Sequence, residues 1–190
     1  MNTILCIFSI IPALIILGIS SSYAQSSDDF HKYTNDVMNF TIKYPSNWHV
    51  KENSETQSDR VWFELSGRSL PIFSVETEKV EGDLEVEHHD DGETITQNMP
   101  SLEELAQHEI DEKMTLEFRD FDLINQNKVT VGGNSGWKME FVGQDNFSLF
   151  EICTIANGKI YILTYQDYSS KAPETLPLAN KMVESFQIKT

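Results

Sequence analysis

Residues 39–48 read N-F-T-I-K-Y-P-S-N-W, a short alternating strand that runs into a Tyr-Pro turn and then a tryptophan. Phe40, Ile42 and Tyr44 alternate with polar residues, which is the period of a half-buried β-strand. Pro45 ends this strand because proline has no N–H to contribute to the ladder. We expect the chain to turn there and to resume an extended conformation at Trp48.

Downstream of this turn, residues 61–65 and 71–80 also alternate and predict a β meander. The next stretch, Glu81–Pro100, is acidic and rich in turn residues. We expect it to be a long loop, or at most a frayed hairpin.

The C-terminal half contains two hairpin signals. Residues 121–141 alternate across the glycine-rich turn Gly132–Gly136 and predict a hairpin. The runs Phe147–Ala156 and Ile160–Tyr165 are apolar on both faces and flank Asn157-Gly158, a dipeptide that favours a type I′ turn. We therefore expect these last two runs to be central strands, covered on both sides.

Two helices are predicted. Ser101 and Glu104 have the spacing of a capping box ahead of an apolar stripe, which predicts a helix ending near Phe118. Pro177 is expected to open a second helix, whose stripe continues to Phe186. The fold class is therefore α+β, with one twisted antiparallel sheet and helices packed against its faces.

The N-terminus has the composition of an export signal. Residues 4–19 are almost uninterruptedly apolar, and Ser22-Tyr23-Ala24 is a small-x-small pattern that signal peptidase accepts. Residues 1–24 are therefore expected to be a signal peptide or, since no lysine or arginine precedes the apolar run, an uncleaved membrane anchor. We expect a flexible linker at 25–32 and one domain at 33–190, secreted or extracytoplasmic.

The chain has 14 lysines and arginines against 30 aspartates and glutamates, a formal net charge of −16. Such an excess repels phosphate backbones and anionic lipid headgroups, which argues against nucleic acid as a partner and limits membrane contact to an uncleaved N-terminal segment. Cations and basic protein surfaces remain compatible partners. Cys153 is the single cysteine beyond the leader, so the exported part cannot form an internal disulfide and depends on packing.

Three stretches resemble the PsbP-like domain family. Asn35–Trp48 is similar to the family's opening motif, in which a polar turn leads into an aromatic strand, Tyr-Pro and a tryptophan; Lys128–Phe141 and Leu178–Ile188 are similar to its glycine hairpin and closing helix. The resemblance implies an α/β/α sandwich around an antiparallel sheet. It also implies an exported, non-enzymatic accessory or assembly factor.

The best-known members of that family are extrinsic subunits of photosystem II, which bind a membrane complex and influence its retention of calcium and chloride. Their basic docking residues have no position-by-position match in this acidic chain, so that particular role does not transfer.

The best candidate site in the sequence is an acidic, histidine-containing loop. Imidazole and carboxylate groups gather at Glu85, Glu87, His88, His89, Asp90, Asp91 and Glu93. These are ligands for zinc or copper, and the carboxylates also suit calcium. Against a metal site, the spacing matches no established metal motif, and acidic loops are ordinarily just solvated. No other cofactor is expected.

Catalysis is not expected. Ser135 lies between glycines that do not have the spacing of a nucleophile elbow, and His31, His49 and His108 are scattered over different elements. Trp48, Trp62 and Trp137 are either packing residues or the lining of a ligand pocket.

Asn39-Phe40-Thr41 and Asn146-Phe147-Ser148 are N-glycosylation sequons, and Asn146, in a turn, is the better acceptor.

Two functions remain open. We favour a non-catalytic accessory module at the outer face of a membrane, which presents its acidic surface to a membrane or cell-surface protein with a basic face. The alternative is a metal- or small-ligand-binding protein that uses residues 85–93.

Overall fold

The computed structural model describes residues 29–52, 59–80, 83–89, 92–98, 100–115, 121–143 and 146–189. Twelve strands and two helices lie within these ranges. Their bounds are β1 Phe30–Asn35, β2 Phe40–Pro45, β3 Trp48–Glu52, β4 Arg60–Leu65, β5 Ile72–Lys79, β6 Asp83–His89, β7 Gly92–Asn98, α1 Leu102–Thr115, β8 Phe121–Val131, β9 Asn134–Gly143, β10 Phe147–Ala156, β11 Lys159–Tyr168, α2 Ala172–Ser185 and β12 Gln187–Ile188.

The central layer is a seven-stranded antiparallel sheet with the order β3-β4-β5-β11-β10-β9-β8. β11 lies in the middle of this sheet and β10 beside it, which confirms the prediction of central strands from their two apolar faces. The two residues that join them, Asn157 and Gly158, have φ angles of 53° and 71°, as a type I′ turn requires.

The prediction of a single sheet was wrong, because the opening strand belongs to a second sheet of order β1-β2-β12. β1 and β12 occupy the two edges of β2, so β2 has no edge left for β3. The chain passes from one sheet to the other at the turn after Pro45, where the Ser46 N–H donates to the Asp29 carbonyl at 2.9 Å. The Tyr-Pro turn therefore connects two sheets.

β1 begins at Phe30, inside the stretch predicted to be a flexible linker. Phe30 pairs with Pro45 across the ladder, packs against the main core and lies beneath the Lys181 ammonium group. Order therefore begins before Tyr33, because an aromatic side chain anchors the strand.

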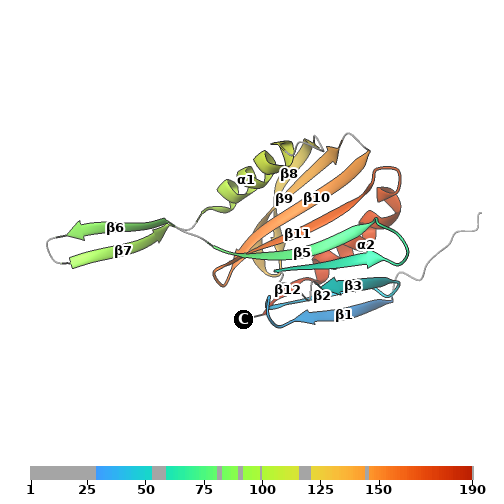
Figure 1. The fold of residues 1–190 in the computed structure, drawn as a ribbon, viewed down its shortest axis with the longest axis horizontal. Helices are drawn as coiled ribbons and strands as arrows, with labels where there is room; N and C mark the ends of the chain where they lie inside the picture. The colour runs from blue at the N-terminus through green and yellow to red at the C-terminus, as the bar shows by residue number, and fades with distance from the viewer. Residues whose placement is uncertain are drawn as a thin grey trace, which may run out of the picture.

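The acidic stretch that we expected to be a long loop, or at most a frayed hairpin, contains a two-stranded hairpin of β6 and β7, here called the arm. In the ladder Asp83 is paired with Asn98, and His89 with Gly92. Figure 1 shows the arm projecting from the body at the point where β5 ends and α1 begins.

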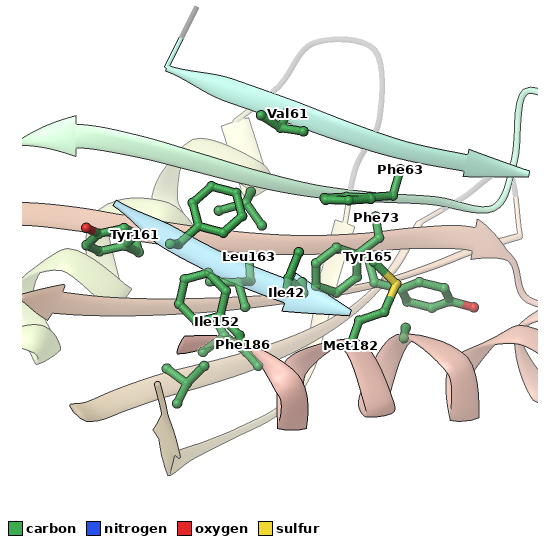
Figure 2. Close-up of a cluster of buried hydrophobic side chains, with 14 of the residues drawn as sticks. Ile42, Val61, Phe63, Phe73, Ile152, Tyr161, Leu163, Tyr165, Met182 and Phe186 are labelled. Carbon is green, nitrogen blue, oxygen red and sulfur yellow. The ribbon is translucent and has the colours of Figure 1, made fainter. Parts of the chain in front are cut away.

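The main hydrophobic core joins the two sheets to α2. Aromatic rings connect its parts: Tyr44 of β2 lies 5.4 Å from Phe63 of β4, and Phe40 lies 5.4 Å from Phe186 at the end of α2. Figure 2 shows Met182 and Phe186 facing sheet residues such as Leu163. Each fully buried aromatic or aliphatic side chain stabilises the fold by about 1.5–3 kcal/mol.

A second core lies under α1. Ala106 and Ile110 of the helix pack there with Met139 of β9 and with Leu149 and Cys153 of β10. The neighbouring β10 residues Phe150 and Ile152 belong instead to the main core. β10 therefore contributes alternate residues to the two cores.

The second helix starts earlier than predicted. α2 begins at Ala172, with Pro173 in its first turn, and Pro177 lies inside the helix. Proline is tolerated in a first turn because its missing N–H would have no helical partner there. The other helix, α1, starts with the predicted capping box, and it is described as far as Thr115, so the expected end near Phe118 lies outside the described residues.

Candidate functional site

A cleft of about 920 Å³ lies between the start of α1 and the strands β4 and β5. Trp62 comes from β4, Glu76 and Glu78 come from β5, and Leu105 comes from α1. Asp59, Arg60, Thr77, Lys79, Pro100 and Ile160 complete its lining. We name this hollow the Trp62 cleft.

The strand registers explain why these side chains meet. Arg60 is paired with Glu76 in the β4–β5 ladder, and Glu78 is paired with Ile160 in the β5–β11 ladder. Side chains two residues apart on a strand share one face, and cross-strand partners share it too. These residues and Trp62 therefore belong to one face of the sheet, opposite the face of the main-core residues Val61 and Val75.

Charged and apolar groups are mixed in the cleft. Arg60 and Glu76 form an ion pair, with 44% and 23% of their side chains exposed, so each largely compensates the charge of the other. Glu78 and Asp59 add exposed carboxylates. Trp62, Leu105 and Ile160 supply apolar surface that is only partly covered at Trp62 and Leu105.

The Trp62 cleft lies next to the most acidic part of the chain. Residues 80–112, here called the acidic segment, contain 12 of the 30 acidic residues and no lysine or arginine. Within it, Glu103, Glu104, Gln107, His108 and Asp111 are exposed on α1. The chain's negative charge is thus concentrated in the acidic segment, which includes β6, β7 and most of α1.

The α1 start is held by the predicted capping box. The Ser101 N–H donates to Glu104 Oε2 at 2.7 Å, and the Glu104 N–H donates to Ser101 Oγ at 3.2 Å. The hydrogen bond from the Ser101 backbone lowers the pKa of the Glu104 carboxyl, so Glu104 remains charged on the surface of α1.

The predicted metal ligands Glu87, His88 and His89 lie in β6, where the structure describes the backbone, and Asp90 and Asp91 lie outside the described residues. The ladder pairs His88 with Glu93 and His89 with Gly92. Because successive strand positions belong to opposite faces, the two histidine positions lie on different faces of the arm. Among the side chains that the structure describes, no group of three or more histidine, cysteine, aspartate or glutamate residues could hold a metal ion.

The three tryptophans do not share a pocket. Trp48 is 4% exposed and belongs to the main core. Trp62 lines the cleft, whereas Trp137 lines a separate hollow of about 390 Å³ beside the start of α1. There the Trp137 indole N–H donates to Gln126 Oε1 at 3.1 Å, and Lys128 lies over its ring.

The residues considered for catalysis lie in separate surroundings. His31 packs edge-on against Tyr44, His49 contacts Glu64 and Ser66, and His108 is exposed on α1. Cys153 is fully buried, and desolvation raises the pKa of its thiol to about 11, which suppresses the reactive thiolate.

Both sequon asparagines are exposed and adopt positive φ angles, 59° at Asn39 and 57° at Asn146. The residue that follows each of them is a buried phenylalanine. N-glycosylation at these two residues stays a prediction.

The cleft escaped prediction from the sequence because its lining comes from β4, β5, β11 and α1, whose neighbourhood depends on strand order. The clustering of acidic residues in residues 80–112 could have been found by counting charge along the chain.

The model of the PsbP family matches residues 28–188. Among solved structures, the solution structure of cyanobacterial PsbP (CyanoP) from Synechocystis sp. PCC 6803 is similar, with a TM-score of 0.61 and 14% identity over 84% of this chain and 92% of that one. LpqN of Mycobacterium tuberculosis, described as involved in cell envelope biogenesis, has a TM-score of 0.52 and 13% identity over 86% of this chain and 87% of its own. At these identities the likenesses establish the fold alone.

A search of curated proteins found no match. Within the described residues, neither helix has the length and apolar character needed to cross a membrane.

Proposed function

The chain belongs to the PsbP family, and from this premise we propose that it is a non-catalytic accessory module, exported to the outer face of a membrane, that binds a basic protein surface through its acidic segment. The observation that carries the proposal is the concentration of 12 acidic residues, without a lysine or arginine, in residues 80–112.

The position of these charges supports a docking role. The two strands of the arm project from the body, and Glu103, Glu104 and Asp111 are exposed on α1, where a partner can approach (Figure 1). A localised field of one sign raises the rate of encounter with an oppositely charged surface and disfavours anionic partners. Charge spread evenly over the surface would favour solubility without selecting a docking face.

An extracytoplasmic location agrees with the apolar N-terminus and with the description of LpqN as an envelope-biogenesis protein. The layered scaffold proposed with this function is an α/β/α sandwich, in which α1 and α2 cover opposite faces of the seven-stranded sheet. Its support is the alternation of β10 residues between the two cores.

Affinity capture from native membranes, with the exported chain as bait, tests the proposal. We expect captured proteins with basic surfaces, which are released when NaCl rises from about 0.05 M to about 0.5 M, because added salt shortens the screening length. In the arm variant, the six acidic residues within 83–98 are replaced by their amides. In the matched control, six exposed acidic residues elsewhere are replaced in the same way, among them Asp36, Asp122 and Glu184.

The arm variant should lose the captured protein and the control should keep it. Equal loss in both variants would show that overall charge, and not a docking face, holds the partner. Capture that is insensitive to salt would contradict the proposal outright.

The second candidate function is metal binding by the arm, which the pairing of His88 with Glu93 favours by placing a histidine and a glutamate at opposed positions of the ladder. Calorimetry with zinc, copper and calcium tests it. Heat that disappears in the His88→Ala/His89→Ala variant and with chelator would support it, and the absence of such heat would reject it.

A further inference from the structure

We propose that the Trp62 cleft receives lysine or arginine side chains from an extended segment of the partner protein. This inference rests on the proposed function and deepens it, since it assigns the contact that follows the first electrostatic encounter. The basic side chains of the partner are then recognised in the Trp62 cleft, between the sheet and α1.

The size and form of the cleft suit such an occupant. Its volume of about 920 Å³ lies at the upper end of the range for ligand sites, about 300–1,000 Å³, and it opens to solvent. Its walls come from the sheet on one side and from the start of α1 on the other. An open, two-walled cleft admits a chain that enters and leaves, as a peptide segment does.

The chemistry of the lining matches long cationic side chains. Lysine and arginine combine an apolar stem with a charged head, and they bury the stem along apolar surface. Leu105, Ile160 and the Trp62 ring offer surface for the stem, and the indole also attracts a cation placed over its face. The exposed Glu78 and Asp59 carboxylates would accept hydrogen bonds from the charged head.

The one arginine in the cleft does not exclude a cation, because the Arg60 guanidinium is already ion-paired with Glu76. Glu78 lies on the same face of β5 as Glu76, two residues further along the strand. An incoming cation would therefore meet a carboxylate next to a compensated ion pair.

The position of the cleft links it to the acidic segment. Lys79 ends β5 just before the arm, Pro100 lies just after it, and both residues line the cleft. A basic segment drawn toward the arm therefore arrives beside the cleft. The excess of acidic charge makes a phosphate-bearing occupant unfavourable at the same position.

Titration of ¹⁵N-labelled exported chain with capped pentalysine, followed by the three tryptophan indole N–H signals, tests the inference. We expect the Trp62 signal to shift, while those of Trp48 in the core and Trp137 in its separate hollow stay in place. Capped pentaglutamate is the control probe. A titration in which no indole signal moves, or in which Trp137 moves instead of Trp62, overturns the inference.

Two variants measure how much Glu78 and Trp62 contribute to the affinity for pentalysine. Glu78→Gln should weaken pentalysine binding by about two- to fivefold, the range for a partly exposed ion pair, and Trp62→Ala should weaken it by about tenfold. Glu184→Gln removes the same charge from the exposed side of α2 and should change binding less than about twofold. The indole signals of Trp48 and Trp137 report whether each variant remains folded.

Failure of this inference is distinguishable from failure of the proposed function. If the native partner is still captured by Trp62→Ala and Glu78→Gln but is lost when the arm is neutralised, the cleft has no role and the acidic docking function stands. If the partner is also retained by the arm variant, the proposed function itself is overturned.

Discussion

Cys153 shows how packing sets the chemistry of a single side chain. Its sulfur lies in the core beneath α1, within 3.8 Å of the Trp137 carbonyl oxygen. Burial, together with the nearby Glu109 and Glu151, raises the pKa of the thiol from 9.0 to about 11. The thiolate fraction near pH 8 therefore falls by about two orders of magnitude.

We predict that iodoacetamide near pH 8 leaves Cys153 unmodified in the folded protein and alkylates it within minutes in about 6 M guanidinium. Mass spectrometry of the exported part, in which Cys153 is the single cysteine, measures both states. Since the folded pKa is raised, the protonated thiol favours the folded state, and this contribution is lost as pH rises from about 9 through about 11. Rapid modification of the native protein would show that α1 does not cover the sulfur.

The capping box at Ser101 and Glu104 is a second residue-scale feature that can be tested. Ser101→Ala removes the hydroxyl that accepts from the Glu104 N–H, and we expect the free energy of unfolding to fall by about 0.5–2 kcal/mol. Ser101→Asp should restore most of it, since aspartate also caps helices. Because the pKa of Glu104 is lowered, its stabilising contribution is present at neutral pH and is lost as pH falls below about 4.5. Chemical denaturation at neutral pH and near pH 3.5 measures both effects.

At the scale of elements, a buried polar network fixes the start of α2. Asp167, 1% exposed at the end of β11, accepts from Thr175 Oγ1 at 2.5 Å and from the Tyr168 N–H at 2.8 Å. The Thr175 hydroxyl also lies 2.8 Å from the Tyr165 hydroxyl. Burial raises the pKa of Tyr165 to about 12, so its phenol stays protonated and available to this network.

Thr175→Val keeps the shape of the side chain but leaves Asp167 without this donor. We predict a loss of about 1–3 kcal/mol in unfolding free energy, because a buried carboxylate then lacks a hydrogen bond. Thr175→Ser retains the hydroxyl and should lose less than half as much. A loss in Thr175→Ser that equals or exceeds the loss in Thr175→Val, measured by urea denaturation, would show that the hydroxyl contributes no more to stability than the methyl group does.

The elements also show what local sequence can and cannot predict. The Asn157-Gly158 hairpin and the Ser101–Glu104 cap were predicted correctly because each is determined by a few neighbouring residues. We predicted that α2 begins at Pro177, because proline favours the first turn of a helix. In the structure Pro173 occupies that first turn. The Asp167–Thr175 hydrogen bond joins β11 to α2, so it depends on tertiary structure and is not visible in the local sequence. The partners of β2 were missed for a related reason, since β12 lies at the other end of the chain.

At the scale of the whole molecule, the distribution of charge could be predicted from the sequence and the Trp62 cleft could not. The sequence indicates an acidic exported domain, and counting along it locates the acidic segment. The Trp62 cleft requires residues from β4, β5 and β11 and from α1, which are brought together by strand order. Glu78 looks like any other surface glutamate until its register beside Ile160 is known.

The arm provides the last test, because it separates the stability of the fold from its docking function. β6 and β7 pair only with each other among the described strands. Asp83 and Asn98 are cross-strand partners, so their Cα atoms lie about 5 Å apart and a Gly-Gly link can replace residues 83–98. We predict that this deletion leaves the melting temperature by circular dichroism within about 3 °C of the wild type, which for a domain of this size is about 1 kcal/mol. It should also abolish salt-sensitive capture of the basic partner, because it removes six carboxylates. A deletion variant that melts far below the wild type would show that the arm stabilises the domain. One that still captures the partner would overturn docking through the acidic arm.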